Sequence, residues 1–446
     1  MCFTNIGIGR GYEDTFSQCF SRFSYNLAYF IIGLIMNRFE EFTTQFVQQL
    51  GKKDGAVSPV IANSASFGYG DAQIAEGIFD GSVKKPLYAR VGNPTSAQLE
   101  SVLATMDGGV GAIATSTGMA ATTLATMSLL KSGDDIISVG GLFGGTYSFF
   151  SETLSRFGMK TQFFDVDEFE AIEKAITQKT KIIFLESVGN PNMRLPDIAK
   201  IASIANQHGI VLIVDNTTTP LSIAPLKLGA DIVVYSTTKI VTGNASSLGG
   251  AAVFRAIREE DDKFKTPRYE EVHKFIKKMG KMALIANAKK RAMRDFGMSA
   301  NAFGSYLTML GLETLPLRMD RVVSSVEKIV SALDEAGLHV NHPSLSSHPH
   351  HERYKTEFSQ GCGSLLTIDM ETKEKAFAFI NRLKLATITA NIGDSRTLVL
   401  HMASTIYSDF SEEIRAFLGI TDGLIRVSIG LENPKDIIKD FLDASV

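Results

Sequence analysis

The chain has 446 residues, of which 44% are hydrophobic and 21% charged, and its 48 acidic residues nearly balance its 45 basic ones. A chain of this length can bury a large core without disulfides, and its charge balance argues against nucleic acid as the main partner. Three cysteines cannot form a disulfide framework and no run of about 18 apolar residues predicts a membrane span, so we expect a cytoplasmic protein.

Residues 1–35 differ from the rest of the chain, because they lead into the apolar run at 27–36 (LAYFIIGLIM). A signal peptide has a basic start and a small-residue cleavage site, but here the basic start is weak and no such site follows. We interpret residues 1–35 as an upstream extension, with Met36 opening the functional chain. An exported leader and a buried core element are the alternatives. Residues 37–50 then have the apolar spacing of a helix.

Short apolar runs alternate with helical patterns between residues 111 and 237. The runs lie at 111–117, 135–140, 161–166, 181–187, 210–216 and 231–237, and helical patterns include 119–130 and 197–208. Runs that are continuously apolar suit strands buried on both faces of a parallel sheet. The sequence therefore predicts an α/β fold with a mostly parallel sheet covered by helices, and ligands on such sheets bind beyond the carboxyl ends of the strands.

The pattern changes from about residue 296, where helical segments at 300–336 and 374–388 mix with short strands at 364–370 and 426–430. We expect four units: an extension of doubtful role (1–35), an N-terminal arm (36–94), a ligand-binding domain (95–295) and a smaller C-terminal α+β domain (296–446). Residues 255–294 carry 13 basic and six acidic residues. We interpret that segment as a solvated helical face, with a docking patch for an acidic partner as the alternative.

Two charged residues follow strands and suggest a cofactor. Lys239 ends the segment STTK after the run at 231–237, and Asp215 lies near the end of the preceding run. A desolvated lysine has a lowered pKa and can form a Schiff base, and a buried aspartate needs a cationic partner. Pyridoxal 5′-phosphate (PLP) offers an aldehyde for the lysine, a pyridinium nitrogen for the carboxylate and a phosphate for nearby hydroxyls.

A phosphate site is predicted independently at residues 115–120 (TSTGMA), which end the first strand and open a helix. Gly118 would let the backbone approach an anion closely, and the helix N-terminus favours negative charge. Alone, this loop fits any nucleotide binder. The chain lacks the G-x-G-x-x-G pattern and the P-loop lysine, which weakens dinucleotide and NTPase alternatives.

These residues, with others in a fixed order, resemble the Cys/Met-metabolism family of PLP enzymes of fold type I. The motifs are TSTGMAA, ESVGNP, VDNT, the STTK lysine and GLIRVSIGLE, and the resemblance runs from about residue 37 to 446. The stretches GLETLPLRM (311–319) and ANIGDSRTL (390–398), with the insertion around 255–294, favour the O-acetylhomoserine sulfhydrylase branch.

The resemblance implies a role for each matching residue. Lys239 would form the Schiff base with PLP and act as the catalytic base, and Asp215 would hold the pyridinium nitrogen. Asn190 would bond the ring hydroxyl and contact the substrate, and Arg426 would bind the substrate carboxylate. The cofactor phosphate would be held by Gly118, Met119, Ser236 and Thr238, with Tyr88 and Arg90 reaching the phosphate of a neighbouring subunit.

The chain departs from the family pattern in two places. Phe143 stands where the family usually has a tyrosine that stacks on the cofactor, so the stack is kept and the hydroxyl is lost. Tyr88 of a neighbouring subunit is our candidate for the missing catalytic hydroxyl. Residues 401–407 (HMASTIY) replace the usual His-Pro-Ala stretch, and Gly145 stands where methionine γ-lyases typically have cysteine.

The resemblance implies γ-replacement on an activated homoserine ester: O-acetylhomoserine and sulfide, or a thiol, give homocysteine and acetate in methionine biosynthesis. A γ-lyase or cystathionine γ-synthase on the same scaffold, and a PLP-binding protein without turnover, are the alternatives. It also implies a homotetramer built from dimers that share active sites. We expect no metal, and we interpret His348, His350 and His351 as a solvated loop, with a metal site as the alternative.

Overall fold

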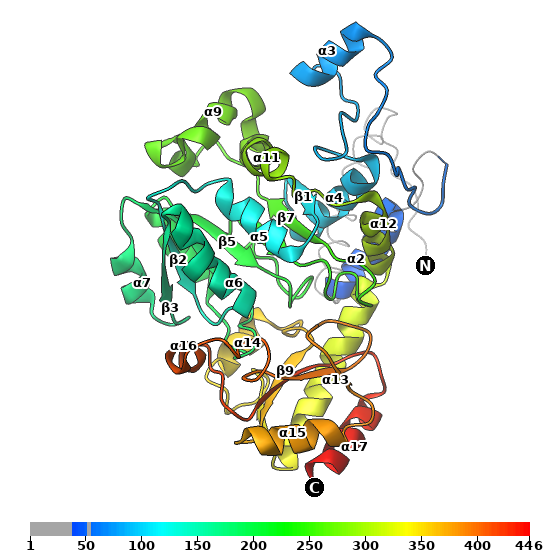
Figure 1. Ribbon diagram of the computed structural model, residues 1–446, viewed down its shortest axis with the longest axis vertical. Coiled ribbons are helices and arrows are strands. Elements are labelled where there is room, and N and C mark those ends of the chain that lie inside the picture. Colours follow the sequence, from blue (N-terminus) through cyan, green and yellow to red (C-terminus); the bar gives the residue numbers. More distant parts are fainter. Residues whose placement is uncertain (1–37, 51–54) are drawn as a thin grey trace, which may run out of the picture.

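The computed structural model describes residues 38–50 and 55–446, so the interpretations of residues 1–35 lie outside the described residues. The described chain forms a larger part around one sheet and a smaller part, formed by the C-terminal residues, around a second sheet (Figure 1). The helix expected at 37–50 is confirmed as α2 (Arg38–Leu50), which buries Phe39, Phe42, Phe46 and Leu50.

The larger part is centred on a sheet of seven described strands. In spatial order they are β1 (Gly111–Thr115), β7 (Gly250–Phe254), β6 (Ile232–Tyr235), β5 (Val211–Asp215), β4 (Thr180–Glu186), β2 (Asp135–Val139) and β3 (Lys160–Phe164). β7 runs antiparallel to both of its neighbours, and the other paired strands are parallel. The six predicted strands and the mostly parallel sheet are confirmed. β7 is not among the predicted strands.

Helices cover both faces of this sheet, because alternate strand residues point to opposite sides. One face packs against α5 (Gly118–Met127), α9 (Glu270–Met279) and α10 (Ala283–Ala288). The opposite face packs against α7 (Phe169–Ala175) and α8 (Ile198–Gln207) at one end, and against α2, α4 (Pro94–Asp107) and α12 (Ala302–Glu313) at the other. Asp197 caps α8 by accepting a hydrogen bond from the Lys200 backbone N–H at 2.8 Å.

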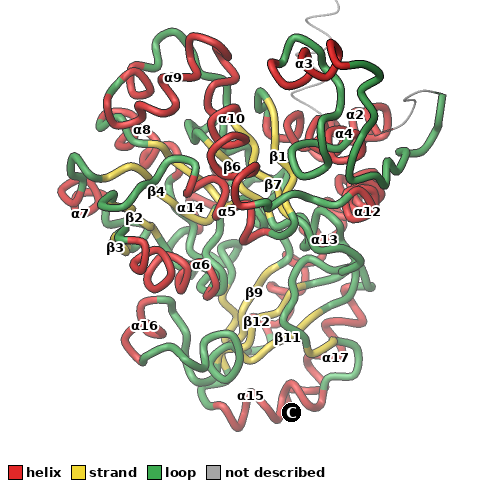
Figure 2. Tube along the Cα trace, turned by 45° about the horizontal axis from the view of Figure 1, so that its top comes forward, coloured by secondary structure: helices red, strands yellow, loops and turns green. Residues whose placement is uncertain are grey.

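The smaller part contains a five-stranded sheet that Figure 2 shows below the first. Its spatial order is β10 (Thr387–Ile388), β11 (Leu398–His401), β12 (Leu424–Ser428), β9 (Leu365–Asp369) and β8 (His339–Asn341). Its core is shared with α13 (Leu315–Glu335), α15 (Lys373–Arg382) and α17 (Pro434–Ser445). The other described α-helices are α3 (Ala72–Asp80), α6 (Gly144–Ser148), α11 (Arg294–Phe296), α14 (His351–Glu357) and α16 (Glu412–Phe417). The predicted α+β character of the C-terminal segment is confirmed.

The expected solvated histidine loop is wrong for two of its members, because His348 and His350 are buried. His350 accepts a hydrogen bond from the Leu195 backbone N–H through Nδ1 at 2.9 Å, and its Nε2 lies 2.9 Å from Asp167 Oδ2. Both partners are more than 150 positions away in the sequence. The loop docks on the larger part, a contact that local sequence does not reveal.

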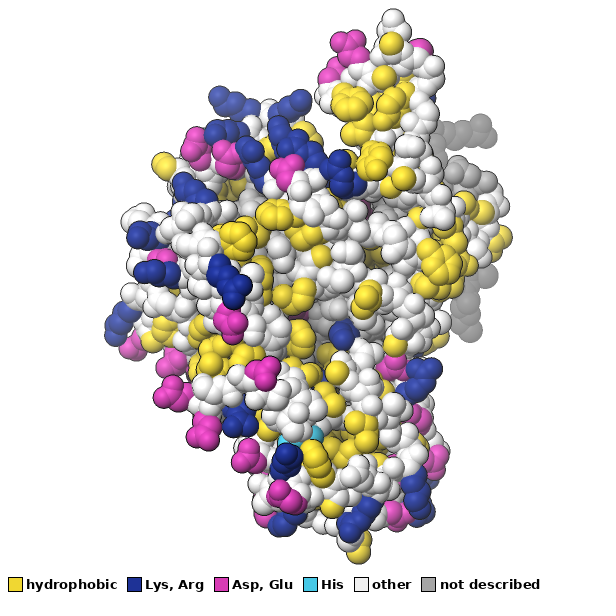
Figure 3. All heavy atoms as spheres, in the orientation of Figure 1, with side chains coloured by type: hydrophobic (Ala, Val, Ile, Leu, Met, Phe, Trp, Pro, Cys, Tyr) yellow, Lys and Arg dark blue, Asp and Glu magenta, His cyan; other side chains and the backbone are white. Residues whose placement is uncertain are grey.

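The basic segment at 255–294 begins after β7 and includes α9 and α10. Lys274, Lys277 and Lys278 of α9 are exposed, as expected for a solvated helical face. Figure 3 shows Lys and Arg side chains gathered over this region at the upper left. Across residues 38–50 and 55–446, no helix is both long and apolar enough to cross a membrane.

Candidate active site

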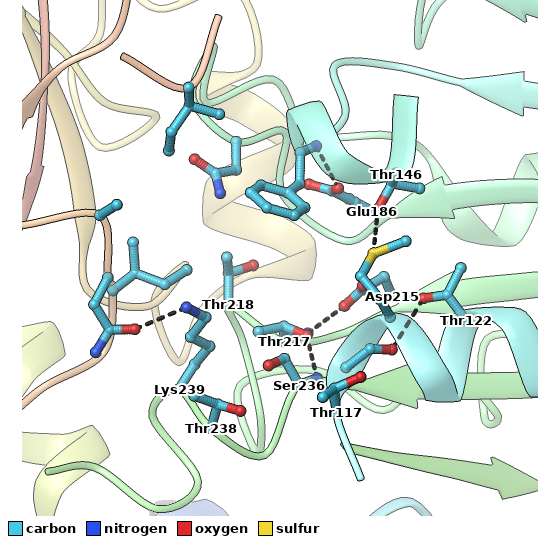
Figure 4. Close-up of a pocket in the computed structure, with 18 of the residues that line it drawn as sticks. Thr117, Thr122, Thr146, Glu186, Asp215, Thr217, Thr218, Ser236, Thr238 and Lys239 are labelled. Carbon is cyan, nitrogen blue, oxygen red and sulfur yellow. Dashed lines mark hydrogen bonds between the residues drawn. The ribbon is translucent and has the colours of Figure 1, made fainter. Parts of the chain in front are cut away.

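The carboxyl ends of the parallel strands open into a cavity of about 380 Å³ at the edge of the main sheet (Figure 4). Every predicted site residue outside the N-terminal arm lines it: Gly118, Met119, Phe143, Asn190, Asp215, Ser236, Thr238, Lys239 and Arg426. Thr117, from the predicted phosphate loop, also lines the cavity, and so do Glu186, Thr217 and Asn391, which no sequence pattern assigned to the site.

Lys239 follows β6 and points its side chain into the cavity (Figure 4). Its Nζ donates a hydrogen bond to Asn391 Oδ1 at 2.7 Å. Burial, reinforced by the positive charge of Arg426, lowers the pKa of Lys239 to about 8. A fraction of the amine is therefore neutral near neutral pH and able to act as a nucleophile or base.

Asp215 ends β5, one strand from Lys239, and also faces the cavity. Its Oδ1 accepts a hydrogen bond from the Thr217 backbone N–H at 2.9 Å. Burial raises the pKa of this carboxyl to about 6, although the Thr217 hydrogen bonds oppose the rise. No cation of the described residues contributes to that pKa, so the carboxylate lacks the positive partner that a pyridinium nitrogen would supply.

The segment after β1 meets the segment after β6 at very close range. A Cβ on Gly118 would lie 2.5 Å from Ser236 Cβ, so only glycine allows this approach. Thr117 caps α5 by accepting a hydrogen bond from the Ala120 backbone N–H at 3.0 Å. The first turn of the helix faces the cavity, because Gly118 and Met119 line it. A helix N-terminus with a glycine beside it is a suitable site for a phosphate group.

Thr238 lies beside this phosphate site, but its hydroxyl is already paired with Gly249. It donates to the Gly249 carbonyl at 3.1 Å and accepts from the Gly249 N–H at 3.0 Å. A phosphate oxygen needs a donor, so Thr238 would contact it only after the hydroxyl turns away from Gly249. Its assignment to the phosphate stays a prediction.

Arg426 reaches the cavity from β12 of the second sheet. Its guanidinium donates to Asn190 Oδ1 and to the Asn391 carbonyl, each at 3.3 Å. Burial lowers the pKa of Arg426 to about 10, and no carboxylate of the described chain contributes to that pKa. A buried guanidinium with only neutral oxygen partners is suited to an incoming carboxylate.

Phe143 lines the cavity, and the residue is 37% exposed. A Cβ at Gly145 would lie 2.6 Å from Phe143 Cε1, so the glycine leaves room for the ring in this position. The Phe143 backbone N–H donates to Glu186 Oε1 at 2.7 Å. Burial, with Asp215 nearby, raises the pKa of Glu186 well above its ordinary value.

Tyr88 and Arg90 do not line the cavity of their own chain. The Arg90 guanidinium lies over the Tyr88 ring, 5.6 Å from its centroid, and donates to the Arg294 carbonyl at 2.6 Å. Both side chains are exposed. They therefore contribute nothing to the site within one chain, and their predicted action on a neighbouring subunit remains a prediction.

A family model for Cys/Met metabolism PLP-dependent enzymes matches residues 43–445. The chain belongs to this family. It is 36% identical over 406 residues to homocysteine/cysteine synthase of Saccharomyces cerevisiae, covering 86% of this chain and 91% of the relative. It is also 36% identical over 375 residues to O-acetyl-L-homoserine sulfhydrylase 1 of Thermus thermophilus, covering 80% and 88%.

A solved structure supports the same family. A putative O-acetylhomoserine (thiol)-lyase of Campylobacter jejuni superposes with a TM-score of 0.83 at 32% identity, over 90% of this chain and 99% of that one. That structure contains a pyridoxyl-lysine phosphate group. The expected fold type and the PLP dependence of the family are confirmed by these matches.

The cavity fits PLP on the chemistry of its side chains. Lys239 offers an amine of lowered pKa for the aldehyde, and Asp215 offers a carboxylate without a cationic partner for the ring nitrogen. The N-terminus of α5 and Ser236 offer donors for the phosphate, and Phe143 offers a ring face. When bound, PLP supplies an electron sink that stabilises negative charge at the substrate Cα.

Proposed function

We propose that this protein catalyses γ-replacement on O-acetylhomoserine. Sulfide replaces acetate at Cγ: the C–O bond breaks, a C–S bond forms, and the products are homocysteine and acetate. This places the protein in methionine biosynthesis. A thiol in place of sulfide would give acetate and the homocysteine thioether that carries the thiol's own substituent. The named activities of the relatives support the proposal, because they include homocysteine synthase and O-acetylhomoserine sulfhydrylase.

The observation that carries the proposal is the pairing of Lys239 and Arg426 in one cavity. An α-amino acid has a carboxylate and an amino-bearing Cα close together. Arg426 would hold the carboxylate bidentately, which a lysine does less well. Lys239 Nζ would then remove the proton from Cα, and the same amine would return a proton later in the reaction.

Asn391 and Asn190 connect these two groups. Asn391 accepts from Lys239 through its side chain and from Arg426 through its carbonyl, while Asn190 accepts from Arg426. A substrate bound to Arg426 would therefore be held at a fixed position relative to the base. Such orientation lowers the barrier without any new chemical group.

A steady-state assay of the purified protein tests the proposal. Acetyl-, succinyl- and phosphohomoserine are each supplied with sulfide, with cysteine or alone, and homocysteine, cystathionine and 2-oxobutyrate are measured. We expect homocysteine from acetylhomoserine and sulfide. 2-Oxobutyrate and ammonia without sulfide would instead show a γ-lyase, cystathionine would show a cystathionine γ-synthase, and no turnover would leave a PLP-binding protein.

We also propose that the protein acts as a homotetramer of dimers with shared active sites, in the cytoplasm. The position of Tyr88 and Arg90 outside their own cavity supports sharing. The arm with α3 projects from the body (Figure 1), and its residues Val57, Val60 and Phe79 are largely exposed. A second subunit would cover these apolar side chains and receive Tyr88 and Arg90.

A further inference from the structure

The Leu142–Phe143 peptide group, just before α6, is held at both ends by buried side chains. Its N–H, on Phe143, donates to Glu186 Oε1 at 2.7 Å. Its carbonyl, on Leu142, accepts from the Tyr407 hydroxyl at 3.3 Å. Tyr407 is fully buried and Glu186 is 7% exposed, so water does not compete freely for either contact.

Tyr407 also contacts the backbone of Asn190. The Tyr407 hydroxyl lies 3.1 Å from the Asn190 carbonyl, so its one proton is shared between two carbonyls. The Asn190 backbone N–H also faces the Glu186 carboxylate, because it lowers the pKa of Glu186 against the rise that burial causes. Glu186 and Tyr407 therefore join the loop before α6 to the loop after β4.

Tyr407 reaches this position from the second sheet, in the loop after β11. It belongs to the segment 401–407, where the sequence departs from the family pattern. Its neighbourhood is tight: a Cβ on Gly144 would lie 3.1 Å from Ile406 and 3.2 Å from both Tyr407 and Phe410. Tyr407 does not line the cavity, so its hydroxyl has no direct access to a substrate there.

We infer that Tyr407 and Glu186 are positioning residues that orient the Phe143 ring against the cofactor and place Asn190 beside it. The chain of contacts then continues to Arg426, which donates to Asn190 Oδ1. The inference rests on the proposed function only in requiring PLP beside Phe143. It does not depend on which ester or sulfur compound reacts.

The test compares Tyr407→Phe with a matched control, Tyr354→Phe, in the holoenzyme. Tyr354 is also buried and donates through its hydroxyl at 2.5 Å, but its acceptor, Glu327, lies on α13 rather than on a loop beside the cavity. Both variants lose one hydroxyl and keep the ring. We expect Tyr407→Phe to weaken the visible circular dichroism band of bound PLP and to lower kcat about 3–10-fold, with KM nearly unchanged. Tyr354→Phe should leave both at the wild-type values.

Hydrogen exchange of the holoenzyme gives a readout that does not use activity. Peptides covering 142–147 and 189–192 should exchange faster in Tyr407→Phe and unchanged in Tyr354→Phe. Glu186→Gln keeps the side-chain volume but replaces one carboxylate oxygen with an NH₂ group, which cannot accept a hydrogen bond from a backbone N–H. It should therefore raise exchange in the same peptides. Wild-type dichroism and exchange in Tyr407→Phe, or equal changes in the control, would overturn the inference. A wild-type protein that forms no homocysteine would refute the proposed function and leave these two readouts valid.

Discussion

Lys239 keeps a reactive amine available because its cavity disfavours the charged form. Its pKa is lowered to about 8, whereas the Asp215 pKa is raised to about 6, in both cases chiefly by burial. Between these values Asp215 is ionised and Lys239 is partly neutral. Asp215 at the end of β5 and Lys239 after the neighbouring β6 are thus in the states that a PLP site needs over the same pH range.

The rate of PLP capture by the apoprotein should follow the titration of Lys239. Only the neutral amine attacks the aldehyde, so the rate should rise with pH and level off above about 8, well below the titration range of an exposed lysine. Stopped-flow absorbance of the visible PLP band measures this. A rate that keeps rising to pH 10 would contradict the lowered pKa.

Lys239→Ala is the control for that measurement. It should still bind PLP without a covalent bond, through the phosphate site, and lose activity by several orders of magnitude. Borohydride reduction of the wild-type holoenzyme, followed by peptide mapping, should place the pyridoxyl group on Lys239. A label on another lysine would refute the assignment.

At the scale of single residues, the sequence pattern predicts the site residues that follow strands of the main sheet. It does not predict those that come from the second sheet. Lys239 and Asp215 could be predicted because each stands at the end of an apolar run. Glu186 also ends a strand, so the same rule could have assigned it to the site. Asn391 contacts Lys239, and Tyr407 contacts the loop before α6, both from the part of the chain that forms the second sheet. Such long-range contacts leave no local pattern, and Arg426 of the same sheet was assigned only through its family motif.

At the scale of elements, the close packing of α5 against the strands beside it depends on small residues. Gly250, in β7, approaches Thr117 so closely that a Cβ would lie 2.1 Å from the Thr117 carbonyl oxygen. β7 therefore consists of small residues where it passes beneath the phosphate site. Its sequence, GAAVF, opens with a glycine and two alanines, which are depleted in strands, so the pattern did not indicate a strand there.

Gly118→Ala should damage cofactor binding. The added Cβ would lie 2.5 Å from Ser236 Cβ and 2.9 Å from Ser236 Cα, so α5 and the segment after β6 must separate. Overpacking of this kind typically costs about 1–3 kcal/mol. Titration of the apoprotein with PLP should show affinity reduced about tenfold, together with a lower Tm.

Gly68→Ala is the matched control, because a Cβ there would have no heavy atom within 4 Å. It should bind PLP as the wild type does. An unchanged PLP affinity in Gly118→Ala would show that the loop adjusts freely, and that the phosphate site does not depend on this glycine.

On the scale of the whole molecule, shared sites predict that two inactive variants can restore each other. Arg90→Ala lacks the residue given to the neighbour, and Lys239→Ala lacks the residue of its own cavity. A mixed dimer contains one site in which both residues are present. With random mixing, half of the dimers are mixed, so we expect about a quarter of wild-type activity after subunit exchange.

The measurement is homocysteine formation after the two variants are unfolded and refolded together. Each variant refolded alone is the control and should stay inactive. Native mass spectrometry with one variant isotopically labelled confirms that subunits have exchanged. Exchange without any recovered activity would contradict the sharing of sites.

Arg426 lies on the second sheet and Lys239 follows a strand of the first, and this division has a consequence for selectivity. In the proposed mode of binding, Arg426 of the second sheet would hold the carboxylate end of a substrate, and Lys239, after a strand of the first sheet, would face its amino-bearing carbon. The distance between the two sheets would therefore determine which length of substrate fits. A small slide of one sheet over the other would bring a longer or shorter amino acid into register while every reacting side chain stays the same.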